Sequence, residues 1–181
     1  MAGGFKTRGL KSIIFSLRHR QYNPIKFWND RRKLGLGFYQ PISNNEKRQI
    51  EVVINNFGKR VLEVGCGTQN FSYLSYYMGV DFSIIALKGQ KNVCCADVRY
   101  LPFRNKCFDV TISRGMLMHV PDIQGAIDEI TRVTRRLVVL REELSVGKLA
   151  KHCFNHDYQS LMKGWSLWGR FPYEVFVFDE Q

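Results

Sequence analysis

The sequence lacks the long apolar run and the cysteine framework that would place it in a membrane or outside the cell. No apolar stretch approaches the roughly 18 residues that a membrane-spanning helix needs. The five cysteines are odd in number, none has C-x-x-C spacing, and no secretory signal is evident. These absences exclude a disulfide framework and favour reduced thiols in a cytoplasmic protein. The four histidines are scattered without zinc-site spacing, so no metal is expected.

Acidic residues are absent from the first 29 positions, and this absence makes the charge uneven. Residues 1–60 hold 13 Lys and Arg against three acids, a net charge of +10, whereas residues 61–181 hold 14 against 13, a net of +1. We therefore expect a basic N-terminal arm or lid at residues 1–45 and a nearly neutral domain at residues 46–181. The arm can meet nucleic acid, an anionic membrane surface or an acidic substrate, or it can simply be a solvated face.

Apolar residues at helical spacing lie within residues 5–20 among basic side chains. This pattern fits either a mitochondrial transit peptide or an amphipathic helix at a membrane surface. Peripheral membrane contact through this segment is therefore one expectation for the arm.

Short apolar strands alternate with helices over residues 46–140. Strands are predicted at residues 60–64, 78–81, 93–96, 108–113 and 137–140, and helices at 46–57, 71–77 and 122–135. Strands separated by helices imply a parallel, doubly wound sheet. A further helix is predicted within residues 145–162, and two strands at 165–168 and 173–178 around a short link suggest an antiparallel pair. The predicted fold is α/β: a Rossmann-like, doubly wound, mainly parallel sheet with a C-terminal antiparallel strand pair.

The run Glu63-Val64-Gly65-Cys66-Gly67-Thr68 takes a buried strand directly into a glycine pair. Ligands bind at the carboxyl ends of the strands in open α/β sheets, and glycines there let the backbone approach a ligand closely. A nicotinamide dinucleotide fits poorly for two reasons. The spacing is G-x-G-T rather than G-x-G-x-x-G, and Glu63 would repel a pyrophosphate.

Acidic residues also follow the next two predicted strands. Asp81 stands in G-V-D-F-S and Asp97 in A-D-V-R, and a fourth strand runs into S-R-G-M-L-M-H-V-P-D. A carboxylate can accept hydrogen bonds from two neighbouring hydroxyl groups. Either acid could instead be a turn or helix-cap residue. The joint occurrence of these features in order, at strand ends, is what favours a ligand site.

These features, over about residues 60–140, resemble the class I methyltransferases that use S-adenosylmethionine (SAM), particularly small enzymes with loops of the LDVGCGTG type. The resemblance implies that Glu63 holds the methionine amino end, that Asp81 binds the ribose hydroxyls and that Asp97 faces the adenine amino group. Further implied cofactor contacts are Gly65, Cys66, Gly67, Gln69, Phe82, Ser83, Val98, Ser113 and Arg114. Gln69 departs from the family, which has a third glycine there, and this puts the fit of the methionine end in doubt.

The segment after strand four lies beside the transferred methyl group in this family. His119 is the candidate base or substrate contact because its pKa suits proton removal near neutrality, or it packs the loop against the next helix. Arg114 can pair with an acidic substrate group or with a surface acid. The family's substrate pocket is roofed by the N-terminal segment and by the insert after strand five. The corresponding lid candidates are Tyr22, Trp28, Arg31, Tyr39 and Trp165.

The sequence therefore predicts an enzyme that methylates an oxygen or nitrogen of a small-molecule or lipid-like acceptor and releases S-adenosylhomocysteine. RNA is the alternative acceptor, because aromatic residues interleave with the basic arm. A non-catalytic SAM-binding partner subunit is a third interpretation, motivated by Gln69 and the small insert. A nicotinamide dehydrogenase is a distant fourth.

Overall fold

The computed structural model describes residues 23–33, 43–68, 71, 73–142, 153–170 and 174–178. Tyr22, Tyr39, Gln69 and residues 5–20 lie outside this set, so the expectations attached to them stay predictions. No helix of the described segments combines the length and the apolar character that a bilayer crossing requires.

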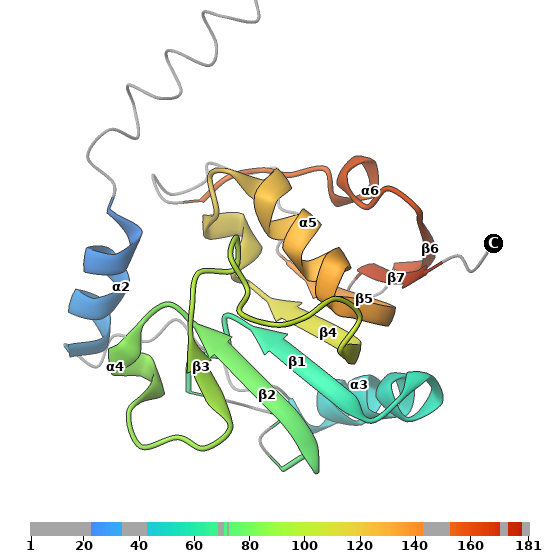
Figure 1. Ribbon diagram of the computed structural model, residues 1–181, viewed down its shortest axis with the longest axis horizontal. Coiled ribbons are helices and arrows are strands. Elements are labelled where there is room, and N and C mark those ends of the chain that lie inside the picture. Colours follow the sequence, from blue (N-terminus) through green and yellow to red (C-terminus); the bar gives the residue numbers. More distant parts are fainter. Residues whose placement is uncertain are drawn as a thin grey trace, which may run out of the picture.

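The described strands form one seven-stranded sheet in the order β3-β2-β1-β4-β5-β7-β6 (Figure 1). The five parallel strands are β1 (Arg60–Val64), β2 (Tyr76–Asp81), β3 (Val93–Cys95), β4 (Phe108–Arg114) and β5 (Thr134–Arg141). Strands β7 (Glu174–Phe178) and β6 (Trp165–Arg170) complete the sheet in antiparallel pairing beside β5. The predicted fold class is therefore confirmed, including the antiparallel pair at the edge.

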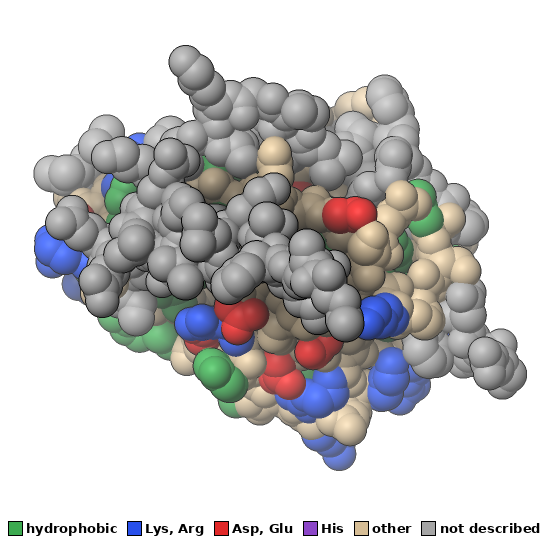
Figure 2. Space-filling model, turned by 90° about the horizontal axis from the view of Figure 1, so that it is seen from above, with side chains coloured by type: hydrophobic (Ala, Val, Ile, Leu, Met, Phe, Trp, Pro, Cys, Tyr) green, Lys and Arg blue, Asp and Glu red, His purple; other side chains and the backbone are tan. Residues whose placement is uncertain are grey.

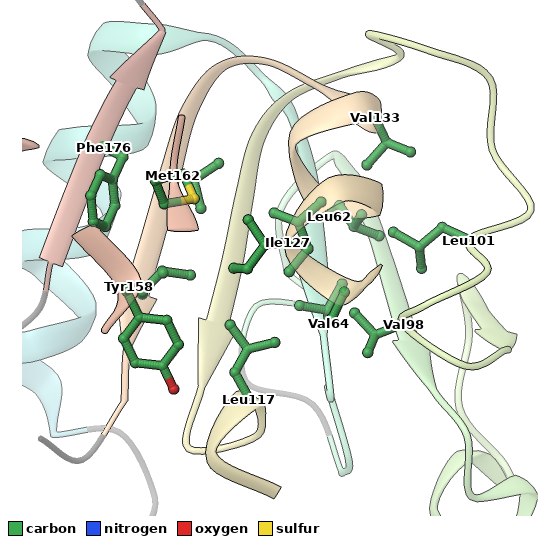
Figure 3. Packing of buried hydrophobic residues seen from close by; sticks show 14 of the residues in the cluster. Leu62, Val64, Val98, Leu101, Leu117, Ile127, Val133, Tyr158, Met162 and Phe176 are labelled. Carbon is green, nitrogen blue, oxygen red and sulfur yellow. The ribbon is translucent and has the colours of Figure 1, made fainter. Parts of the chain in front are cut away.

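Helices cover both faces of the sheet because the apolar residues of β1 and β5 alternate between two cores. Leu62 and Val64 of β1 pack with α5 (Ile123–Val133) in one core, which Figure 3 shows. Val61 lies in the other core with Ile50 and Ile54 of α3 (Asn44–Phe57). The remaining described helices are α2 (Pro24–Lys33), α4 (Ile84–Leu87), the 3-10 turn η1 (Leu117–His119) and α6 (Tyr158–Leu161).

The helix predicted over residues 71–77 is wrong. Tyr76 and Tyr77 belong to β2, and the described residues just before them form turns and bends. Tyr77 is extended because it pairs with Val61 of β1 and buries its ring in the same core. Within the predicted helix at 145–162, residues 153–157 have no regular structure and α6 begins only at Tyr158. The helix predicted at residues 122–135 is α5, which is shorter (Ile123–Val133), and the side chain of Asp122 before it makes no capping hydrogen bond.

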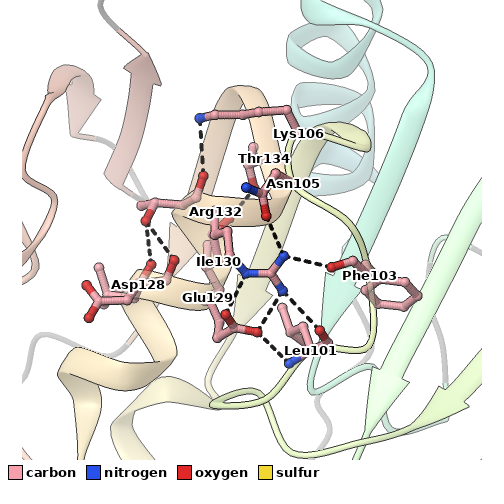
Figure 4. Close-up of polar contacts among 11 residues, drawn as sticks. Leu101, Phe103, Asn105, Lys106, Asp128, Glu129, Ile130, Arg132 and Thr134 are labelled. Carbon is pink, nitrogen blue, oxygen red and sulfur yellow. Dashed lines mark hydrogen bonds and ion pairs between the residues drawn. The ribbon is translucent and has the colours of Figure 1, made fainter.

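Arg132 of α5 fastens the segment that follows β3 to the helix (Figure 4). Its guanidinium donates to the carbonyl oxygens of Leu101 (3.0 Å) and Phe103 (2.7 Å) and to Asn105 Oδ1 (2.8 Å). Glu129 binds the same guanidinium at 2.6 and 2.9 Å and accepts from the Leu101 amide at 2.7 Å. These bonds satisfy backbone groups of a segment that has no sheet partner.

Replacing Arg132 with methionine should lower the free energy of unfolding by about 1–3 kcal/mol, because charged hydrogen bonds to backbone carbonyls are lost. The midpoint of urea unfolding measures this change. Arg136→Met is the matched control, since Arg136 is exposed on β5 and its loss should change stability by less than about 0.5 kcal/mol. Equal midpoints for the two variants would contradict the role given to Arg132.

Candidate functional site

The predicted site residues follow strands that run in parallel, so the strand ends bring them to one edge of the sheet. Val64 of β1 is in register with Val80 of β2 and with Ser113 of β4, and Ser113 is in register with Leu140 of β5. The residues immediately after these positions therefore meet at the carboxyl edge, where ligands bind in open α/β sheets.

The loop after β1 needs its glycines for backbone conformation and for space. Gly65 and Gly67 have φ angles of +70° and +50°, which side chains disfavour. A Cβ atom at Gly65 would also lie 2.3 Å from Cγ of Met116, in the segment after β4. The amide of the intervening Cys66 donates to the Val80 carbonyl at 3.0 Å, which anchors the loop to β2.

Asp81 ends β2 with its carboxylate fixed by two backbone amides. Gly67 N–H donates to Oδ2 at 3.0 Å and Ser83 N–H donates to Oδ1 at 2.8 Å, and the residue is 7% exposed. The first of these bonds ties Asp81 directly to the glycine loop. A carboxylate offers about four acceptor positions, so one held by two amides can also accept from a pair of hydroxyls.

Glu63 is a second buried carboxylate on the same side of the sheet, 2% exposed. The Tyr77 hydroxyl donates to Glu63 Oε2 at 2.6 Å, and burial raises the pKa of Tyr77, so the phenol stays protonated as a donor. Burial also raises the pKa of the Cys66 thiol, with Glu63 and Asp81 adding to the shift. Cys66 is wholly buried, and its predicted contact with the cofactor stays a prediction.

Asp97 follows β3 as predicted, but its carboxylate already accepts hydrogen bonds from Arg99, two residues further along the chain. Arg99 donates to Asp97 from its amide (2.9 Å), its Nε (3.0 Å) and its Nη2 (2.6 Å). Hydrogen bonding from the Arg99 side chain holds the pKa of Asp97 below its ordinary value. The neighbouring Val98 is 8% exposed and joins the core. An adenine contact at Asp97 stays a prediction.

Ser113 is wholly buried and supports a carboxylate that the sequence analysis missed. Its hydroxyl donates to Glu142 Oε1 at 2.6 Å, and Glu142 follows β5 directly with 8% exposure. Arg114, the last residue of β4, is half-buried and in register with Arg141 of β5. Glu142 lies in the charged run Arg141-Glu142-Glu143, a pattern typical of solvent-exposed segments. No signal in the sequence distinguishes Glu142 from these neighbours as a buried residue.

His119 lies where three distant segments meet. The Trp28 ring of α2 contacts the imidazole edge to face, with centroids 4.9 Å apart, and Cys153 Sγ lies 3.6 Å from His119 Nδ1. Arg31, also of α2, places its guanidinium over the Phe27 ring at 5.4 Å. Two of the three described lid candidates, Trp28 and Arg31, thus lie on helix α2, and Trp28 contacts His119.

Trp165 does not join this group, which corrects its prediction as a lid residue. It begins β6 opposite Phe178, at the amino edge of the parallel strands, and is 8% exposed in the core. Lys106, which precedes β4, lies over its ring at 5.4 Å. β6 is an edge strand of the sheet, and the Trp165 ring belongs to the same buried cluster as Tyr158 and Met162.

Helix α2 also reaches the other side of the site. The Ser83 hydroxyl donates to Asn29 Oδ1 at 2.6 Å, and Ser83 Oγ itself accepts from the Ala86 amide at 3.3 Å as the N-cap of α4. Ser83 is two residues from Asp81, with half-buried Phe82 between them. One helix of the basic arm therefore contacts both the segment after β2 and the segment after β4.

His156 lies in the segment after β5 between two aromatic rings. Its imidazole stacks on Phe154 with centroids 6.1 Å apart and meets Tyr158 edge to face at 5.9 Å. Burial lowers its pKa below the ordinary value. Among the described residues, no three His, Cys, Asp or Glu side chains gather as metal ligands.

The comparisons with known proteins agree with this geometry. Residues 62–140 match the family described as methyltransferase domain. The chain is 33% identical over 133 residues to an uncharacterised protein of Methanocaldococcus jannaschii, covering 67% of this chain and 51% of that protein. It is 28% identical over 111 residues to phosphatidylethanolamine N-methyltransferase of Cereibacter sphaeroides, covering 52% and 55%. This chain thus spans about half the length of either relative.

Solved structures share the fold at low identity. A SAM-dependent methyltransferase of Thermotoga maritima, described as a possible histamine N-methyltransferase, superposes with a TM-score of 0.55 at 15% identity, covering 94% of this chain and 96% of that one. A protein of Pyrococcus horikoshii superposes with a TM-score of 0.55 at 17% identity, covering 78% and 95%. These likenesses bear on the fold alone.

Acid should destabilise the protein partly through His156. The unfolded imidazole titrates near ~6.5, whereas burial holds the folded pKa lower. As the pH falls through ~6.5, the unfolded chain takes up the proton first, so the free energy of unfolding falls. His156→Gln should lose less stability between about pH 7.5 and 5.5 than the original protein in urea unfolding. An equal loss in both proteins would show that His156 is not responsible.

Proposed function

This chain belongs to the class I methyltransferases by its domain and its fold, and from that premise we propose that it transfers a methyl group from SAM to an acceptor and releases S-adenosylhomocysteine. The observation that carries the proposal is Asp81, a buried carboxylate at the end of β2 that the glycine loop holds through Gly67 N–H. A carboxylate in this place suits paired ribose hydroxyls and disfavours a phosphate.

The other residues fit SAM by the chemistry of their donor and acceptor groups. Glu63 supplies negative charge at the end of β1, which suits the amino group of the methionine portion. Gly65 and Gly67 present backbone without side chains to the same portion. Val98 and Asp97 follow β3, where the adenine ring is expected. Ser113 contributes indirectly, because its hydroxyl is buried against Glu142.

SAM supplies a methyl group that its sulfonium already activates, so the chain need only orient the acceptor, exclude water and, where required, remove a proton. His119 is the proposed group for the last task. Its Nδ1 lies beside the Cys153 thiol, and its ring is held by Trp28. Arg114, at the end of β4, is the proposed contact for an acidic group of the acceptor.

The acceptor we propose is a small molecule or a lipid-like molecule, methylated on oxygen or nitrogen. The walls around His119 include an indole ring and a thiol, which suit an organic acceptor with apolar surface. The similarity to a phosphatidylethanolamine N-methyltransferase supports a lipid-like headgroup as one acceptor to test.

RNA is the alternative acceptor, and the net charge of +10 over residues 1–60 is its motive. On the surface seen in Figure 2, basic and acidic side chains stand next to each other among the described residues.

Residues 1–45 are proposed to act as arm and lid of a domain at 46–181, and residues 5–20 to contact a membrane. The free cysteines suit a cytoplasmic location. The dehydrogenase interpretation is set aside because the matched family is a methyltransferase domain.

Asp81→Asn should weaken the binding of SAM and S-adenosylhomocysteine about 10- to 100-fold, because a charged acceptor is worth about 1.5–3 kcal/mol. Isothermal titration of the full chain measures the dissociation constants. Asp128→Asn is the matched control: Asp128 is exposed on α5, where it accepts from Gln124, and should leave binding unchanged. Unaltered binding by Asp81→Asn, or absence of binding by the original protein, would refute the SAM site.

The acceptor class needs a separate experiment with radiolabelled SAM. Label transferred to phosphatidylethanolamine vesicles or to a panel of small amines and hydroxyl compounds would support the proposal. Label transferred to RNA, with binding that falls steeply as salt rises, would support the alternative instead. Tight SAM binding without transfer to any of these would favour a non-catalytic partner subunit.

A further inference from the structure

Glu142 is a carboxylate buried at the carboxyl edge of the sheet, directly after β5, with three donors around it. The Ser113 hydroxyl donates to Oε1 at 2.6 Å, the Met116 amide donates to the same oxygen at 3.4 Å, and the Met118 amide donates to Oε2 at 3.2 Å. Burying a carboxylate is costly unless hydrogen bonds compensate it, and these donors supply that compensation. Burial raises the pKa of Glu142, and hydrogen bonding from the Ser113 hydroxyl and from the backbone of Met116, Leu117 and Met118 opposes that effect.

The segment that Glu142 holds lies between the two halves of the site. Met116 packs against Gly65 of the glycine loop so closely that a Cβ atom there would overlap it. Met118 accepts a hydrogen bond from the Phe154 amide at 2.7 Å through its carbonyl. His119 follows at once as the last residue of η1. The anchored residues thus touch the cofactor side at one end and the acceptor side at the other.

We propose that Glu142 is a positioning residue of the methyl transfer, which sets the placement of His119 relative to the glycine loop by holding the amides of Met116 and Met118. The proposal rests on the proposed function for the identity of the two sides, but the anchoring itself does not. Glu142 acts through the backbone of these residues and is given no contact with either ligand.

The pattern of bonds requires a carboxylate rather than any polar group. Glu142 uses both oxygens as acceptors, and all three partners are donors. A glutamine has one acceptor oxygen, so its NH₂ group would face a donor and leave a buried amide unsatisfied. The segment must then shift to find other partners, and His119 shifts with it.

Glu142→Gln tests this inference against a matched control, Asp109, which lies near the amino end of β4. Asp109 also accepts from three donors, the Arg60 amide (3.1 Å) and the Arg60 Nε (3.4 Å) and Nη2 (2.9 Å). It lies about 16.5 Å from Arg114 at the carboxyl end of β4, at ~3.3 Å per residue. Asp109→Asn should therefore cost stability without moving the site. Ser113→Ala removes one donor only and should have a smaller effect than Glu142→Gln.

Two readouts are measured on the full chain. The first is the Cε1–H signal of His119 in histidine-labelled protein, assigned with His119→Gln, and its midpoint of pH titration. The second is the dissociation constant of S-adenosylhomocysteine. Glu142→Gln should move the His119 signal and titration midpoint and weaken S-adenosylhomocysteine about tenfold, within the range of coupling energies between contacting groups. Asp109→Asn should change neither the His119 signal nor the dissociation constant of S-adenosylhomocysteine, even where it lowers the free energy of unfolding as much as Glu142→Gln does.

Failure of this inference differs from failure of the proposed function. If the original protein does not bind S-adenosylhomocysteine, the proposed function fails, and the His119 signal still tests the anchoring. If it binds, and Glu142→Gln leaves both readouts unchanged, the positioning role is overturned. The same shifts in Asp109→Asn would also overturn it, because they would reflect loss of stability alone.

Discussion

The parallel arrangement of the five strands β1, β2, β3, β4 and β5 is the constraint on which the rest of the structure depends. It sends the carboxyl ends of these strands to one edge, so Asp81, which ends β2, and Glu142, which follows β5, lie at the same edge although they are far apart in the sequence. A parallel sheet must be covered on both faces, and the alternating apolar residues of β1 and β5 meet that need with α5 on one side and α3 on the other. The polar residues are left to the edge, where backbone amides of the loops can satisfy them.

The two carboxylates Asp81 and Glu142 divide the work at that edge according to what surrounds them. Asp81 is held by Gly67 and by Ser83, both in segments that border the proposed cofactor. Glu142 accepts hydrogen bonds from Ser113 of β4 and from two amides of the segment after β4, so it connects the end of β5 to that segment. A buried carboxylate is stabilised in either case by directed N–H groups, and Asp81 is the one that we propose accepts from ligand hydroxyls. Met116 connects the two by packing on Gly65.

The strands and the acid at the end of β2 could be predicted from the sequence because both follow local patterns. Consecutive apolar residues bounded by turn residues indicated β1 and β5, and Asp81 was located by the strand it ends. Glu142 could not be found this way, since its charged neighbours resemble a solvated turn and only tertiary contacts bury it. The predicted helix over residues 71–77 failed for a related reason, because the pairing of Tyr77 with Val61 overrode a local helical pattern. Trp165 was misplaced because its aromatic character is equally suited to a core.

In helix α2, the described part of the basic arm, some of the positive charge is explained by contacts within the helix rather than by binding to RNA. Lys26 pairs with Asp30 one turn away, and Arg31 lies over the Phe27 ring, so part of the positive charge of α2 is engaged within the helix. The residues that α2 directs to the domain are instead Asn29, toward Ser83, and Trp28, toward His119. An amide and an indole at the two contacts suit an organic acceptor with apolar surface better than a phosphate backbone. This part of the arm therefore favours the smaller acceptor of the two that the charge alone would allow.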